Sequence, residues 1–215
     1  EDVIGININL LDFNGNPISS IFPTFTMENW QPLDITTYHA VDVPAELQPG
    51  IHTLQVSLDY RAGILGSHQI SEVIVPLPQP ENLENLVGTL GDVTLYVPSM
   101  HVQDGQLILD MIWQASATLE QSYRVFVHVA LADDPQPRAQ DDGLPLNGRY
   151  PTRIWQPDEL ISETRMVDIS NLAPGDYVLN IGLYTPETGR LQGANGDFLR
   201  PGTLTINPDG TAIVD

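Results

Sequence analysis

The chain contains no cysteine and no lysine among its 215 residues. Without cysteine it has no disulfide, no thiol nucleophile and no cysteine-ligated zinc. Its eight positive residues are all arginine and face 28 Asp and Glu residues, which gives a formal net charge of −20. Because nucleic-acid binding requires a basic patch, we expect no nucleic-acid partner and no attraction to an anionic membrane surface.

Long hydrophobic runs are missing as well. No run approaches the roughly 18 apolar residues that a membrane helix needs, so we expect no direct membrane insertion of this segment. The sequence starts at Glu1 with neither Met nor a signal-like apolar core. We therefore expect a processed product or an excised part of a larger protein.

The pattern that is present is alternation of apolar and polar residues, which is typical of strands with one buried face. It is clearest in residues 4–10, 54–58 and 125–131. No segment shows a helical period longer than about two turns, and the 17 glycines and 18 prolines are scattered. The sequence therefore predicts an all-β protein of antiparallel sandwiches.

Prolines set the expected strand ends. Pro98 is expected to end a strand at 93–97, and residues 133–154, with four prolines, are expected to be irregular. Three prolines within residues 76–80 predict an extended connector.

One frame occurs twice, 125 residues apart. It consists of Trp-Gln-Pro at Trp30 and Trp155, Pro-Gly at Pro49 and Pro174, and an alternating strand after each Pro-Gly. A second offset, 121, matches residues 4–10 with 125–131. Agreement in both spacing and pattern indicates two copies of one module.

The copies are unequal, because residues 92–122 have no counterpart in the first one. We predict two tandem immunoglobulin-like antiparallel β-sandwich modules, the first lacking its initial strands. The expected ranges are 1–77 for the incomplete repeat, 78–90 for a proline-rich linker and 91–215 for the complete repeat. An uncovered sheet is an association hazard, so we expect the first repeat to pack against a neighbouring domain of the polypeptide or a second copy.

Catalytic motifs are absent from the sequence. There is no Gly-x-Ser-x-Gly elbow, no His-Glu-x-x-His, no phosphate loop and no dinucleotide fingerprint. The five histidines fall in separate expected elements. We therefore expect no enzyme, and a hydrolase is only the third hypothesis for function.

One group of residues is a candidate ligand-binding site. Sugar sites combine aromatic rings with planar polar groups, and loops are the usual place for them. The expected loop brings five such residues together: Asp141, Asp142, Tyr150, Arg153 and Trp155. The alternative interpretation is that Trp155 caps the core, which its recurrence as Trp30 favours; burial of Trp155 would exclude the sugar site.

Two places in the sequence carry acidic residues that could bind a cation. The residues from Asp12 to Asn16 begin like a calcium loop, but position twelve is Pro23 instead of a bidentate Glu. Asp133 and Asp134, with the acidic pair at 141–142, are weak candidate ligands for a cation that would stabilise the loop. Solvated turn residues explain them more simply, so we expect no metal and no cofactor.

The second half resembles a known kind of module on the strength of several motifs. They are Leu-Asp-Met-Ile-Trp-Gln-Ala at 109–115, Tyr-Arg-Val-Phe-Val-His-Val at 123–129, Ala-Gln-Asp at 139–141, Pro-Thr-Arg-Ile-Trp at 151–155, Pro-Gly-Asp-Tyr at 174–177, Gly-Leu-Tyr at 182–184 and Thr-Gly-Arg-Leu at 188–191. The resemblance is to the extracytoplasmic β-sandwich module at the C-terminus of multi-spanning bacterial mannosyltransferase-like membrane glycosyltransferases. Glu163-Thr164 departs from that pattern, which commonly has Asp there.

The resemblance implies an extracytoplasmic location and no catalytic residue, since the transferase chemistry of such proteins lies in their membrane part. The expected function is a noncatalytic accessory or interaction module of a larger membrane or cell-surface protein. The alternative is a carbohydrate-binding or adhesion module, with glycan as its partner.

Overall fold

The structure, a computed structural model, describes residues 3–26, 39–60, 63–80 and 83–215. Its elements are antiparallel strands, with two short 3₁₀ turns in the described part of the chain, so the all-β prediction is confirmed. No helix among the described residues is long and apolar enough to cross a membrane. The chain divides into unit 1 (Glu1–Pro76) and unit 2 (Leu77–Asp215).

Unit 1 is built on one antiparallel sheet with the order β2-β1-β4-β5, and β3 pairs with β1. The strands are β1 (Val3–Leu11), β2 (Pro17–Ile21), β3 (Thr24–Thr26), β4 (Gly50–Tyr60) and β5 (Gly63–Val75). Between β1 and β2, the Asp12 carboxylate accepts hydrogen bonds from the backbone N–H groups of Asn14 and Asn16. Gly15 in this turn has φ +82°, a conformation that glycine adopts without strain.

Unit 1 has an apolar face that no second sheet covers within the described residues. The register pairs Ile6 with Leu58 and Ile8 with Val56, so these side chains share one face. Ile6, Ile8 and Val56 are partly exposed, and Leu58 is 44% exposed. The residues 36–43, rich in Thr, Tyr and Val, predict an extended segment; residues 36–38 lie outside the described residues, and residues 39–43 are not in a strand.

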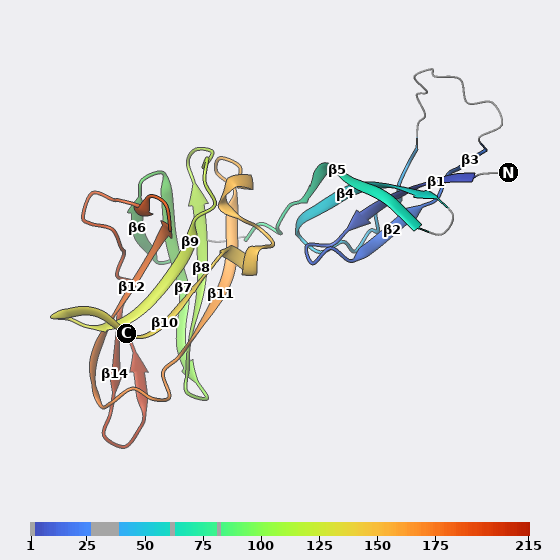
Figure 1. The fold of residues 1–215 in the computed structure, drawn as a ribbon. Helices are drawn as coiled ribbons and strands as arrows, with labels where there is room; N and C mark the ends of the chain where they lie inside the picture. Colours follow the sequence, from blue (N-terminus) through green and yellow to red (C-terminus); the bar gives the residue numbers. More distant parts are fainter. Residues whose placement is uncertain (1–2, 27–38, 61–62, 81–82) are drawn as a thin grey trace. The chain divides into compact units, whose positions relative to one another are not determined.

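Unit 2 contains two sheets that lie in separate layers (Figure 1). One has the order β11-β8-β7-β6, with β6 (Leu86–Leu90), β7 (Val93–Gln103), β8 (Gln106–Ala115) and β11 (Leu160–Asp168). The other has the order β10-β9-β12-β14-β15, with β13 pairing with β12. Its strands are β9 (Arg124–Leu131), β10 (Asp134–Gly143), β12 (Gly175–Thr185), β13 (Gly189–Arg190), β14 (Thr203–Ile206) and β15 (Ala212–Val214).

The core of unit 2 lies between these sheets. Alternate residues of β8, β9 and β12 point into it and are fully or almost fully buried: Leu107, Leu109, Met111, Trp113, Val125, Val127, Val129, Leu179, Ile181 and Leu183. A two-sheet arrangement buries one face of each sheet, which explains why the apolar residues recur with period two.

Three expected boundaries were wrong. β7 continues through Pro98, because its register to β8 shifts between Tyr96 and Ser99, and a bulge accommodates a proline. Much of the stretch expected to be irregular is β10, an edge strand whose prolines lie at a break in its register to β9. The end of the expected 78–90 linker is β6, which pairs with β7 and buries Leu90.

The strand that follows Pro-Gly in the repeated frame is β4 in unit 1 and β12 in unit 2, whereas Trp30 lies outside the described residues. β4 and β12 have the same length and lie 125 positions apart. Ile6 pairs with Leu58, and Val125 pairs with Leu183, so the first strands match at an offset of 119, not 121. The predicted offset is wrong by two residues. Because a strand repeats with a period of two, both offsets align apolar with apolar residues, and the sequence pattern does not distinguish them.

Candidate functional site

The charged cluster in unit 2 begins on β11, whose side chains alternate between the core and the surface. Ile161 and Val167 point inward, and Glu163 and Arg165 occupy the same parity, so both charges are buried. β11 is an edge strand of its sheet. Inward-pointing charges are one way in which proteins keep an edge strand from pairing with another chain.

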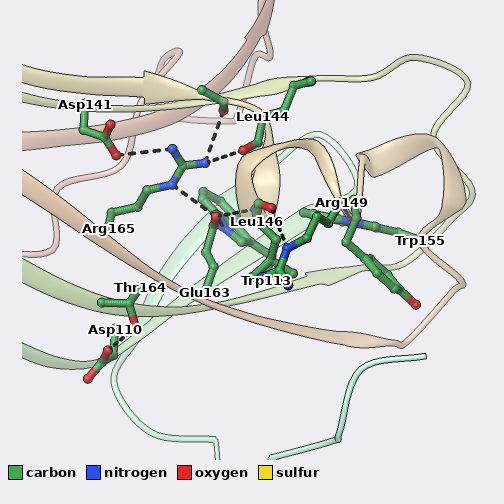
Figure 2. A network of polar contacts seen from close by, with 12 residues as sticks. Asp110, Trp113, Asp141, Leu144, Leu146, Arg149, Trp155, Glu163, Thr164 and Arg165 are labelled. Carbon is green, nitrogen blue, oxygen red and sulfur yellow. Dashed lines mark hydrogen bonds and ion pairs between the residues drawn. The ribbon is translucent and has the colours of Figure 1, made fainter. Parts of the chain in front are cut away.

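Glu163 accepts hydrogen bonds at both carboxylate oxygens (Figure 2). The indole N–H of Trp113 donates to Oε1 at 2.8 Å, and the backbone N–H of Leu146 and the Nε–H of Arg165 donate to Oε2 at 3.1 Å each. Burial raises the pKa of Glu163, and the charge of Arg165 together with the other donors opposes that shift. The carboxylate thus holds together β8, β11 and the turn that contains Leu146.

Arg165 connects the two sheets. Its Nη1 lies 3.2 Å from Oδ2 of Asp141 on β10, and its Nη2 donates to the carbonyl oxygens of Gly143 and Leu144 at 3.2 and 3.0 Å. β10 belongs to the opposite sheet, so the guanidinium closes the sandwich along the β10–β11 edge (Figure 2). Arg suits this role because its planar donors can serve several acceptors at once.

A left-handed turn completes the cluster. The 3₁₀ segment η2 (Pro145–Gly148) includes Leu146 and Asn147 at φ +50° and +56°. A branched residue such as Leu rarely adopts this conformation, and the hydrogen bond from its N–H to Glu163 helps to hold it there. Beside the turn lies a cleft of about 280 Å³, lined by Asp141, Leu146, Asn147, Arg149, Glu163, Thr164, Arg165 and Met166.

The predicted residues Asp141 and Asp142 do not form one site, because neighbours on a strand point to opposite faces. Asp141 pairs with Arg165. Asp142 accepts a hydrogen bond from His128, with Nε2 and Oδ1 3.1 Å apart, on the outer face of β9. Burial lowers the pKa of His128, and Asp142 opposes this.

The structure contradicts an aromatic platform at Tyr150 and Trp155. Trp155 is 0% exposed and Tyr150 is 1% exposed, so neither ring can stack on a sugar. The indole N–H of Trp155 donates to the carbonyl of Tyr150 at 3.0 Å, and the Tyr150 hydroxyl donates to Glu159. Burial, with Glu159 beside it, raises the pKa of Tyr150. Both aromatics close the core, while Arg153, in the 3₁₀ turn η3 (Thr152–Ile154), is exposed.

The weak cation candidates lie apart from the acidic pair at 141–142. Asp134 forms an ion pair with Arg138, with 2.6 Å between Oδ2 and Nη2, and its Oδ1 accepts the N–H of Gln136. Asp133 is exposed. No group of three or more His, Asp or Glu residues within the described ranges could hold a metal ion.

The sequence predicts a strand only over residues 165–169, so Glu163 and Arg165 were missed as a buried pair on β11. The sequence nevertheless contained an indication of this pair. Ile161, Glu163, Arg165 and Val167 alternate along the strand and so lie on the same face. Two opposite charges on a face that is otherwise apolar indicate a buried ion pair. Trp113 and Leu146 could not be linked to Glu163 from the sequence, since these contacts are non-local.

The donors and acceptors of the cluster are directed mainly at one another. Such an arrangement stabilises a closed edge and leaves little capacity for proton transfer to a ligand. Comparison with protein-family models and with curated proteins finds no match to this chain.

Proposed function

We propose that this chain is a noncatalytic accessory or interaction module of a larger membrane or cell-surface protein outside the cytoplasm. The single observation that supports it most is the half-exposed apolar face formed by β1 and β4 in unit 1. Apolar patches that remain open in a folded protein commonly mark contact surfaces. Unit 2, with its filled core, serves in this proposal as the rigid scaffold.

The proposal includes tandem immunoglobulin-like modules, with unit 1 reduced to a single sheet. Supporting it, β1 is flanked by its hairpin partner β2 and by β4, as β9 is by β10 and β12. The equal lengths of β4 and β12 and the matching registers of β1 with β4 and of β9 with β12 add to this agreement. Unit 1 then corresponds to the β9–β12 sheet of a sandwich that lacks its other sheet.

The occupant of the apolar face is a neighbouring domain of the same larger polypeptide. The face offers only a few partly exposed side chains, chiefly Ile6, Ile8, Leu54, Val56 and Leu58. Free association normally requires about 1,200 Å² or more of buried surface. A covalently linked partner needs less, because the linkage supplies a high effective concentration.

The absence of cysteine makes a clean test possible. Leu58→Cys places one thiol on the apolar face, and Ile213→Cys places one on β15, where Ile213 is 53% exposed. We expect maleimide to label both variants rapidly in the isolated chain. In the full-length protein, labelling of Leu58→Cys should slow about tenfold or more, while Ile213→Cys keeps its rate.

Equal labelling of Leu58→Cys in the isolated chain and in the full-length protein would refute the docking role. Protection already present in the isolated chain would show that a second copy covers the face.

A further inference from the structure

β5 forms one edge of the unit 1 sheet. It runs for 13 residues, and its partner among the described strands is β4. The backbone groups on its other side are therefore a template for another strand. Strands of this length are at the upper end of what globular proteins contain.

β5 has few of the charged residues and prolines that usually keep an edge strand from pairing with another chain. Residues 63–75 contain no Lys, Arg, Pro or Asp, and Glu72 is the single acidic residue. Four large aliphatic side chains are exposed along it: Ile64 at 70%, Leu65 at 66%, Ile70 at 56% and Ile74 at 43%. An exposed, long and apolar edge strand favours pairing with another chain.

Two edge strands of unit 2, β10 and β11, are protected by comparison. β10 contains two prolines and the Asp134–Arg138 ion pair. On β11, the side chain of Gln79 accepts the N–H of Leu160 at 2.9 Å and donates to its carbonyl at 3.3 Å. β5 has only two bulges, at Leu65 and Ile70, where its register to β4 shifts. They bend the strand without covering it.

We propose that β5 pairs antiparallel with β5 of a second copy of this chain, around a two-fold axis perpendicular to the sheet. This deepens the proposed interaction role of unit 1 by naming a surface and its partner. An antiparallel pair of identical strands is self-complementary in its backbone hydrogen bonds. β5 is also nearly neutral in a chain of net charge −20, so two copies approach there with little local repulsion.

The pairing has a geometric consequence for the apolar face. An axis perpendicular to the sheet keeps the same face of both copies on the same side. The two faces around Val56 and Leu58 would join into one wider apolar surface. Because the rest of the chain is strongly acidic, added salt should strengthen the dimer.

Sedimentation of the 215-residue chain over a range of concentrations tests the pairing. Wild type should show a concentration-dependent dimer, and Ile70→Glu should raise its dissociation constant about tenfold or more, because the pairing would then bring one added carboxylate from each copy to the shared strand pair, where they repel. Ile213→Glu, a change of the same type at a similarly exposed edge position on β15, should leave the dimer intact.

A cysteine scan through residues 66–72 locates the axis. In an antiparallel pair, disulfide crosslinking should peak at one position and fall on both sides, since bridged Cα atoms lie within about 7 Å of each other. A wild-type monomer at every concentration, or crosslinking without a peak, would overturn the β5 pairing. Neither result changes the expected protection of Leu58→Cys in the full-length protein. The β5 pairing and the docking of the apolar face can therefore be refuted independently.

Discussion

Leu58 and Leu183 occupy matching places in matching strands, yet one is 44% exposed and the other is 0% exposed. Each pairs with the equivalent residue of the preceding long strand, Ile6 or Val125. What differs is the surrounding structure: β12 faces a second sheet, whereas no second sheet covers β4 within the described residues. The same local pattern therefore gives a core strand in one unit and an open face in the other.

The units also differ in where their polar groups find partners. In unit 2, Glu163 and Arg165 are buried and hydrogen-bonded. In unit 1, Oδ1 of Asn7, Oδ1 of Asp59 and Nδ1 of His52 are buried and have no hydrogen-bond partner among the described residues. Unpartnered buried groups lower stability. In the described part of the chain, unit 1 therefore leaves more polar and apolar groups unsatisfied than unit 2 does, which agrees with a role in contacting a further surface.

The variant with the largest expected effect on the stability of unit 2 is Glu163→Ala. It removes the acceptor of three buried donors, namely the Nε–H of Arg165, the indole N–H of Trp113 and the backbone N–H of Leu146, while the two Nη groups of Arg165 keep their other partners. Removing one partner of a buried ion pair typically costs about 3–5 kcal/mol, so unit 2 should lose much of its stability. Urea unfolding followed by the fluorescence of Trp113 and Trp155 measures it.

Thr164→Ser, next to Glu163 on the exposed side of β11, keeps the hydroxyl that donates to Asp110; it is the control and should change stability by less than about 0.5 kcal/mol. If Glu163→Ala does not fold, Glu163→Gln keeps the shape of the side chain and should give an intermediate loss. Similar stability for wild type and Glu163→Ala would mean that the cluster does not hold the edge closed.

The next test is the matched pair Leu183→Ala and Leu58→Ala. Leu183→Ala removes methyl groups from a filled core and should cost about 2–5 kcal/mol. Leu58→Ala removes a side chain that is already half in solvent and should cost about 1 kcal/mol or less. Urea unfolding of both variants measures the difference. Equal costs would show that the face of unit 1 is covered in solution.

The clearest alternation in the sequence predicted strands correctly, while β10, which does not alternate, was missed. Residues 4–10, 54–58 and 125–131 follow the period of two, and each is part of a strand. β10 was missed, because its prolines and acidic residues are typical of a loop. Only its position at a sheet edge makes them compatible with a strand.

The candidate site was less predictable than the fold, because its contacts join distant residues. The sequence placed Asp141 in a candidate ligand site on a loop, whereas it lies on the edge strand β10 and pairs with Arg165, which is 24 positions away. Tyr150 and Trp155 resembled an aromatic platform, and a single sequence does not tell an exposed ring from one that closes a core. The repetition of Trp30 as Trp155 was the useful indication, and it pointed to the core.

A smaller effect is expected from Gln79→Ala, which uncovers the β11 edge and makes it more like β5. The change removes both hydrogen bonds to Leu160 and should cost about 1 kcal/mol. Hydrogen exchange of the Leu160 amide should become several-fold faster, as measured by NMR. Gln103→Ala, at the exposed end of β7, is the control and should not affect this amide. An unchanged Leu160 amide in Gln79→Ala would show that Gln79 does not protect the edge.

The smallest expected effect concerns pH and the outer face of β9. Burial lowers the pKa of His128 below its ordinary value of 6.5, and Arg190 adds to this, while Asp142 opposes it. The unfolded chain then binds a proton that the folded chain resists. Unit 2 should therefore lose stability as the pH falls from about 6.5 through the lowered pKa of the folded state.

Two variants should move this pH dependence in opposite directions. His128→Gln cannot titrate, so its loss of stability between about pH 7.5 and pH 5 should be smaller than that of wild type. Asp142→Asn removes the charge that favours protonated His128, so the loss should be larger. Urea midpoints of unit 2 at the two pH values measure both. Identical pH profiles for the three proteins would show that His128 is not linked to folding, and that this outer face, like the open face of unit 1, is freely hydrated.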